Sequence, residues 1–142
     1  MERRRIAALL GAAALAGSLA APVSAAAAPV TIDLHVDFSL GETFEAEGFC
    51  PSGEAESFGH HIVGNGRATV FHLYKTLACD DGSGTLTIHL SAAAVFGKSG
   101  TIGGWNVVSG TGDYEDARGG GHIVGTAFAG GVDDLYTGTL TR

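Results

Sequence analysis

Several functional motifs are missing from this sequence of 142 residues, and their absence narrows the classes of protein it can belong to. There is no Gly-x-Ser-x-Gly elbow, no phosphate-binding loop ending in Gly-Lys-Ser or Gly-Lys-Thr, and no zinc-protease helix motif, so conventional hydrolases and P-loop enzymes have no signature here. Basic residues are also few, at 8 against 15 acidic ones, and beyond the N-terminus they stand singly. Since binding to phosphates needs a basic stripe, we expect no nucleic-acid partner.

Cysteine is scarce, because Cys50 and Cys79 are the only two. They lack the Cys-x-x-Cys spacing and a neighbouring cation that would activate a thiolate, which argues against a redox-active or metal-binding pair. In an exported chain the expected state is one disulfide between them. Such a bridge closes a loop of about 30 residues and is worth roughly 3–4 kcal/mol to a small domain.

Long hydrophobic runs are limited to one, at the N-terminus. The first five residues include three arginines, and a stretch rich in alanine and leucine follows them. This stretch ends at positions 23–25 in the small residues that signal peptidase accepts. We expect a signal peptide over residues 1–28, cleaved near 25–28, and one secreted, soluble domain over residues 29–142 with no membrane span. Five basic and fourteen acidic residues follow position 25, so the net charge of the mature chain is near −9, which favours solubility outside the cell.

Apolar and polar residues alternate strictly over positions 31–40. The apolar members share one face: Ile32, Leu34, Val36, Phe38 and Leu40. The polar face carries a carboxylate, imidazole and carboxylate row, Asp33, His35 and Asp37. Only a half-buried strand separates two such sets, and the apolar set is expected to face inward. The polar row would serve acid/base chemistry if it lined a cavity, and it is solvated if it lies outside.

Glycine is abundant, at 23 residues, and it separates about eight short alternating segments with no amphipathic helix among them. The expected strands cover residues 31–40, 43–49, 60–63, 67–79, 85–94, 101–108, 122–128 and 135–140, with a polar loop after residue 53. This succession of short alternating segments separated by glycine turns predicts an all-β domain. A single antiparallel eight-stranded barrel is preferred over a sandwich because closure removes the exposed sheet edges.

The six histidines and one acidic turn could suggest a metal site, but their spacing argues against it. His60 and His61 are adjacent and would point to opposite faces of a strand, and no two histidines stand two residues apart. The turn over residues 80–84 lacks the later bidentate glutamate of a calcium loop. We expect no metal.

A glycine-rich corner over residues 107–121, Val-Val-Ser-Gly-Thr-Gly-Asp-Tyr-Glu-Asp-Ala-Arg-Gly-Gly-Gly, joins two of these strands. It resembles the V-V-G-G-T-G-x-F-x-x-A-R-G signature of plant dirigent proteins and, more loosely, the G-T-G-x-Y turn of allene oxide cyclases. Six positions agree with the dirigent pattern: Gly110, Thr111, Gly112, Ala117, Arg118 and Gly119. Tyr114 replaces the phenylalanine, while Ser109 and Glu115 stand where glycine and arginine are usual.

This resemblance implies an eight-stranded barrel of the calycin kind that holds a reactive apolar guest and guides its cyclisation or isomerisation without a cofactor. Arg118 and Asp113 are then the catalytic candidates, with a structural ion pair at the corner as the alternative for the arginine. The apolar interior supplies the candidate ligand-binding residues: Leu34, Val36, Phe38, Ile88 and Trp105.

The alternative is a non-enzymatic secreted interaction protein whose barrel is filled by its own side chains. A cavity of about 300 Å³ or more with a few inward polar groups would distinguish a ligand-binding barrel from this alternative. The oligomeric state stays open, since related barrels often form homo-oligomers.

Overall fold

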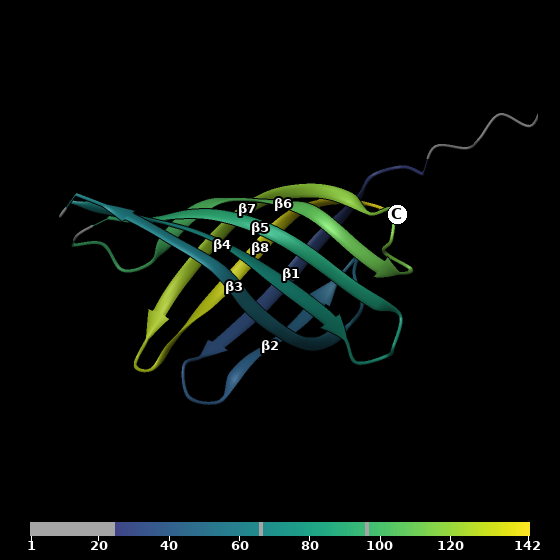
Figure 1. The fold of residues 1–142 in the computed structure, drawn as a ribbon, viewed down its shortest axis with the longest axis horizontal. Coiled ribbons are helices and arrows are strands. Elements are labelled where there is room, and N and C mark those ends of the chain that lie inside the picture. The colour runs from purple at the N-terminus through teal and green to yellow at the C-terminus, as the bar shows by residue number, and fades with distance from the viewer. Residues whose placement is uncertain (1–24, 66, 96) are drawn as a thin grey trace, which may run out of the picture.

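The computed structural model describes residues 25–65, 67–95 and 97–142 as one closed, antiparallel, eight-stranded barrel (Figure 1). Each strand pairs with its neighbours in the chain, and the first strand pairs with the last. The strands are β1 (Ala28–Asp37), β2 (Gly41–Glu47), β3 (Ser52–Gly64), β4 (Ala68–Cys79), β5 (Gly84–Val95), β6 (Thr101–Gly112), β7 (Arg118–Phe128) and β8 (Gly131–Thr141). The predicted all-β barrel is confirmed.

The expected signal peptide falls almost entirely on residues 1–24, which lie outside the described residues. None of the residues that the structure describes belongs to a helix with the length and hydrophobicity of a membrane span.

The two ends of the barrel differ. At one end, here called the closed end, the Cys50–Cys79 disulfide ties the β2–β3 connection to the end of β4, with the two Cα atoms 5.9 Å apart. Phe49 packs there against Tyr114, with ring centroids 4.6 Å apart, and the Arg142 guanidinium lies 5.1 Å from the centre of the Tyr114 ring. The predicted disulfide is confirmed, and these aromatic rings cover the closed end.

The other end, here called the open end, carries the β1–β2, β3–β4, β5–β6 and β7–β8 connections, on the left in Figure 1. The largest fully buried side chains of the barrel come from five strands: Ile32, Leu34, Leu77, Leu86, Ile88, Ile123 and Tyr136. Most of them pack behind the closed end, where the interior is solid, and Ile123 reaches the wall of a cavity in the open half of the barrel. Alternation along each strand sends these residues inward and their neighbours outward, as the period of two requires.

β1 ends earlier than the alternation predicts. The Asp37 carboxylate accepts hydrogen bonds from the backbone N–H groups of Ser39 and Leu40, at 2.8 and 3.0 Å, and Gly41 follows with φ +111°. This side-chain-capped turn stops the strand at Asp37. Phe38 and Leu40 therefore leave the inner face and are 76% and 87% exposed, so the prediction that they belong to a strand was wrong.

β3 is longer than predicted, because residues 52–64 form one strand where a polar loop and a short segment were expected. Its pairing with β4 shifts register between Phe58 and His61, and Gly59 takes a φ of +64°. A β-bulge of this kind inserts extra residues and moves the following side chains to the opposite face. The sequence pattern failed over residues 52–58 because the inward positions Gly53, Ala55 and Ser57 are small or polar, and the bulge at Gly59 hid their continuity with residues 60–63.

Candidate functional site

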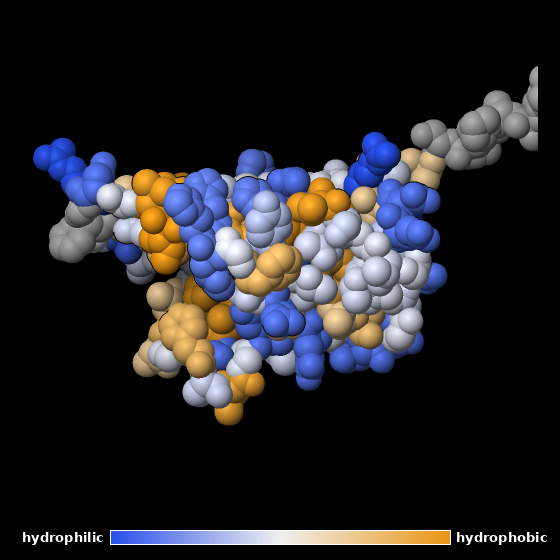
Figure 2. Space-filling view, viewed as in Figure 1, coloured by the Kyte–Doolittle hydropathy of each residue, from blue (hydrophilic) through white to orange (hydrophobic). Residues whose placement is uncertain are grey.

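A cavity of about 800 Å³ occupies the open half of the barrel. Its walls are mainly apolar and come from β1, β4, β5, β7 and β8: Val36, Phe71, Leu73, Leu90, Ile123 and Val132. Hydrophobic residues also gather on the outer surface around this end, on the left in Figure 2. The volume lies within the range of about 300–1,000 Å³ that is usual for ligand pockets.

The cavity stops about half-way down the barrel, so the five predicted ligand-binding residues divide into two groups. Val36 lines the cavity wall and Phe38 lines its rim. Leu34, Ile88 and Trp105 are buried in the solid core behind it and do not line the cavity. The Trp105 indole N–H donates to the carbonyl oxygen of Thr137 at 3.3 Å, which holds this ring in the core. The lumen is therefore half hollow and half packed.

Three polar side chains form a hydrogen-bonded cluster on the cavity wall. The Lys75 ammonium on β4 donates to Glu42 Oε2 on β2, at 2.5 Å, and to Ser57 Oγ on β3, at 2.7 Å. The Ser57 hydroxyl donates in turn to Glu42 Oε1, at 2.6 Å. Lys75 is only 3% exposed, so its charge depends on this pairing for compensation.

A fourth polar side chain, Asp134 on β8, lines the same cavity and is buried. Its Oδ2 accepts a hydrogen bond from the Tyr136 hydroxyl at 3.5 Å, which is long for such a bond. The pKa of Asp134 is raised to about 6, chiefly by burial and also by the nearby Glu42 charge, while Lys75 and the Tyr136 hydrogen bond oppose the shift. The cavity thus holds a carboxyl group that titrates close to neutral pH, which suits an acid or base.

This shift predicts how stability depends on pH. Because the pKa of Asp134 is higher in the folded than in the unfolded chain, its contribution is fully present below about pH 4 and is lost as the pH rises through about 6. The Asp134→Asn variant is therefore expected to unfold at about the same urea concentration as the wild type near pH 4. It should gain up to about 3 kcal/mol over the wild type near pH 7.5. Urea unfolding at both pH values checks this, and a pH-independent difference would contradict it.

The two predicted catalytic residues lie at the closed end, on the opposite side of the solid core from the cavity. Arg118 begins β7 and Asp113 lies in the β6–β7 turn, and both are exposed. Within the described residues, neither side chain forms a hydrogen bond or an ion pair. Gly112 in this corner has a φ of +61°, and a Cβ on Gly110 would overlap the carbonyl oxygen of Tyr114. These two glycines of the corner serve the backbone of the turn.

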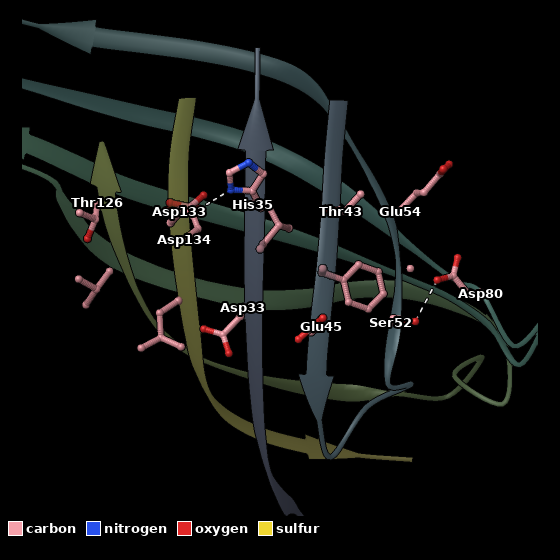
Figure 3. A pocket seen from close by; sticks show the side chains of 15 residues that line it. Asp33, His35, Thr43, Glu45, Ser52, Glu54, Asp80, Thr126, Asp133 and Asp134 are labelled. Carbon is pink, nitrogen blue, oxygen red and sulfur yellow. Dashed lines mark hydrogen bonds and ion pairs between the residues drawn. The ribbon is translucent and has the colours of Figure 1, made fainter. Parts of the chain in front are cut away.

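Asp37 of the polar row of β1 lies at the rim of the cavity, whereas Asp33 and His35 lie on the outer surface, as the alternation predicts. Figure 3 shows His35 and Asp133 meeting there, with His35 Nδ1 2.5 Å from Asp133 Oδ1, beside the exposed Asp33. The hollow around them holds about 660 Å³ and includes Glu45 and Asp80. Asp134 also lines this hollow from its inner side, while the exposed Asp33, Glu45 and Asp133 lack the burial that raises the pKa of Asp134. In the part of the chain that the structure describes, no group of three or more metal-ligating side chains could hold a metal ion.

Sequence reasoning missed the hydrogen-bonded Glu42, Ser57 and Lys75 and the buried Asp134 among the polar residues of the cavity. A signal was present for two of them. Lys75 stands between Leu73 and Leu77 on the inward face of β4, and Asp134 stands between Val132 and Tyr136 on β8. A charged residue on an apolar strand face is expensive to bury, so it is a candidate for function.

No protein-family model, curated protein or solved structure that was compared with this chain matches it. The resemblance of residues 107–121 to the dirigent signature therefore stays a prediction. An eight-stranded barrel can carry many unrelated activities, so function has to be argued from the cavity itself.

Proposed function

We propose that this protein binds a small, largely apolar molecule in the open half of its barrel. The observation that carries this proposal is the cavity of about 800 Å³ with apolar walls and buried polar groups. It exceeds the volume of about 300 Å³ that separates a ligand-binding barrel from a filled one. The apolar walls would supply most of the binding free energy, and the polar groups would fix the orientation of the guest.

Chemistry on the bound guest is a further part of the proposal. Asp134, whose pKa is about 6, is suited to give or take a proton near neutral pH. The Lys75 ammonium is suited to stabilise negative charge that develops nearby. Together they would support cofactor-independent isomerisation or cyclisation, the kind of reaction that the allene oxide cyclase resemblance implies. Arg118 and Asp113 have no role in this scheme, because the solid core separates them from the guest.

The setting that fits this activity is extracellular. The Cys50–Cys79 disulfide indicates an oxidising compartment, since reducing cytosols keep thiols free. We therefore propose a secreted binding protein. A non-enzymatic interaction protein is the alternative, and the solid half of the barrel is the observation that favours it.

Binding of a neutral apolar fluorophore, N-phenyl-1-naphthylamine, tests the proposal. Ala92 lines the cavity on β5, and the neighbouring Ala93 lies on the opposite strand face. Ala92→Phe places an aromatic ring in the cavity and is expected to weaken fluorophore binding at least about tenfold, or about 1.4 kcal/mol. Ala93→Phe is the matched control and should bind as the wild type does.

Fluorescence titration of the three folded proteins measures these affinities, with far-ultraviolet circular dichroism as the check on folding. Absence of binding to the wild type would favour the interaction protein with no ligand. Equal affinities for the wild type and Ala92→Phe would place the bound fluorophore elsewhere and overturn the cavity assignment.

A further inference from the structure

We infer that the guest carries a protonated nitrogen on an apolar body, and that this cation binds the Asp134 carboxylate inside the cavity. The inference rests on the proposed function and names the class of ligand: an alkyl- or arylammonium compound rather than a neutral or anionic lipid. Three observations support this inference: the charges that face the cavity, the hydrogen-bond and ion-pair partners of Asp134, and the space around the Asp134 carboxylate.

The buried charges of the cavity do not cancel. Lys75 and Glu42 form an ion pair with side chains 4% and 14% exposed, and Ser57 joins it. The buried Asp134 is the third charged group on the cavity wall, and when ionised it leaves these three groups with one net negative charge. An anionic guest would meet two carboxylates, whereas a cationic guest would restore neutrality.

Among the described residues, no cation forms an ion pair with Asp134, although Lys75 lies near enough to lower its pKa. In the described part of the chain the ion pairs are Lys75 with Glu42 and His35 with Asp133, and neither includes Asp134. Its only hydrogen-bond donor there is the Tyr136 hydroxyl, at 3.5 Å. A carboxylate can accept about four hydrogen bonds, and a buried charge without a partner is costly. A ligand N–H⁺ group would supply the missing donor and charge together.

The neighbouring strand β7 places a glycine beside the Asp134 carboxylate. Asp134 pairs with Gly125 on β7, and a Cβ on Gly125 would lie 2.6 Å from Asp134 Oδ1 and even closer to Thr101 Oγ1. The absent side chain lets the carboxylate and the Thr101 hydroxyl approach one another over Gly125. Both residues line the cavity, so they present two neighbouring oxygen acceptors to one ammonium group.

The rim also suits a cation. Phe38, Phe71 and Phe128 line the cavity, and the faces of aromatic rings attract ammonium groups. The sequence after position 25 is strongly acidic, with five basic and fourteen acidic residues. The electrostatic field of this part of the protein would attract cations.

Competition among three compounds with the same alkyl chain tests the inference. Decylamine, decanol and decanoate, each below its micelle-forming concentration, displace N-phenyl-1-naphthylamine from the wild type at about pH 7.5, where Asp134 is ionised. Decylammonium should bind at least about tenfold more tightly than decanol, and decanoate should bind most weakly. Asp134→Asn should remove the preference for the amine.

Two further variants sharpen the result. Asp133→Asn, on the outward face one residue away, is the matched control and should keep the preference for the amine. Gly125→Ala should reduce it, because the added methyl group displaces the Asp134 carboxylate.

A pH series on the wild type needs no variant, and the amine preference should fall as the pH drops through about 6. Glu42, Lys75, Tyr136 and Asp133 are the charged or titratable groups that act on Asp134. His60 also lines the cavity, so the same series is measured on Asp134→Asn, in which residue 134 cannot titrate.

The outcomes separate this inference from the proposed function. If decanol binds as tightly as decylamine, or if Asp134→Asn retains the amine preference, the ligand class is wrong and the apolar binding site stands. If neither the fluorophore nor any of the three compounds binds, the proposed function fails, and the inference fails with it.

Discussion

Replacing Lys75 by methionine is expected to lower the free energy of unfolding by about 3–5 kcal/mol. Lys75 holds Glu42 and Ser57 through hydrogen bonds of 2.5 and 2.7 Å inside the barrel. Methionine fills a similar volume but removes the charge, so the Glu42 carboxylate, whose side chain is 14% exposed, loses its cation inside the barrel. Urea unfolding at neutral pH measures the loss.

The double variant Lys75→Met with Glu42→Leu should recover most of this stability, because removing both partners leaves no buried charge from the pair. The two residues are in direct contact, so strong non-additivity is expected. A double variant as unstable as the Lys75→Met protein would show that the pair stabilises the barrel in itself. Recovery would instead show that the fold does not need the pair, which is what a group retained for ligand binding predicts.

The fold was predictable because the alternation of apolar and polar residues indicates strands, and glycine indicates the turns between them. Both patterns depend only on residues that are neighbours in the sequence. The apolar face of β1 from Ile32 to Val36 and the turn before β5, where Gly82 has a φ of +74°, follow from neighbouring residues alone. The predicted strand boundaries failed where a capped turn or a β-bulge interrupts the alternation of inward and outward residues. The Asp37 side chain ends β1, and the bulge at Gly59 divides β3 into two halves of opposite phase.

The candidate site was harder to predict because it depends on which strands meet. Glu42, Ser57 and Lys75 are separated by 15 and 18 residues along the chain, and only the pairing of β2 with β3 and of β3 with β4 brings them together. The division into a closed and an open end is also non-local. It requires Phe49, Tyr114 and Arg142 to meet at one end, and no sequence period reports that contact.

Removing the disulfide with Cys50→Ala and Cys79→Ala is expected to lower the free energy of unfolding by roughly 3–4 kcal/mol. The two cysteines are 29 residues apart, and opening that loop increases the conformational freedom of the unfolded chain. Urea unfolding of the oxidised wild type and the variant measures the difference. Reducing the wild type should reproduce the loss, and the same reductant should leave the variant unchanged.

The same variant tests whether the two ends of the barrel act independently. The disulfide lies at the closed end, and the packed layer that contains Leu34, Ile88 and Trp105 separates it from the cavity. While the variant remains folded, its affinity for N-phenyl-1-naphthylamine should therefore equal that of the wild type. A loss of affinity in the folded variant would mean that the closed end maintains the shape of the open end. The solid half of the barrel would then contribute to binding, because its close packing would carry a change at the disulfide through to the wall of the cavity.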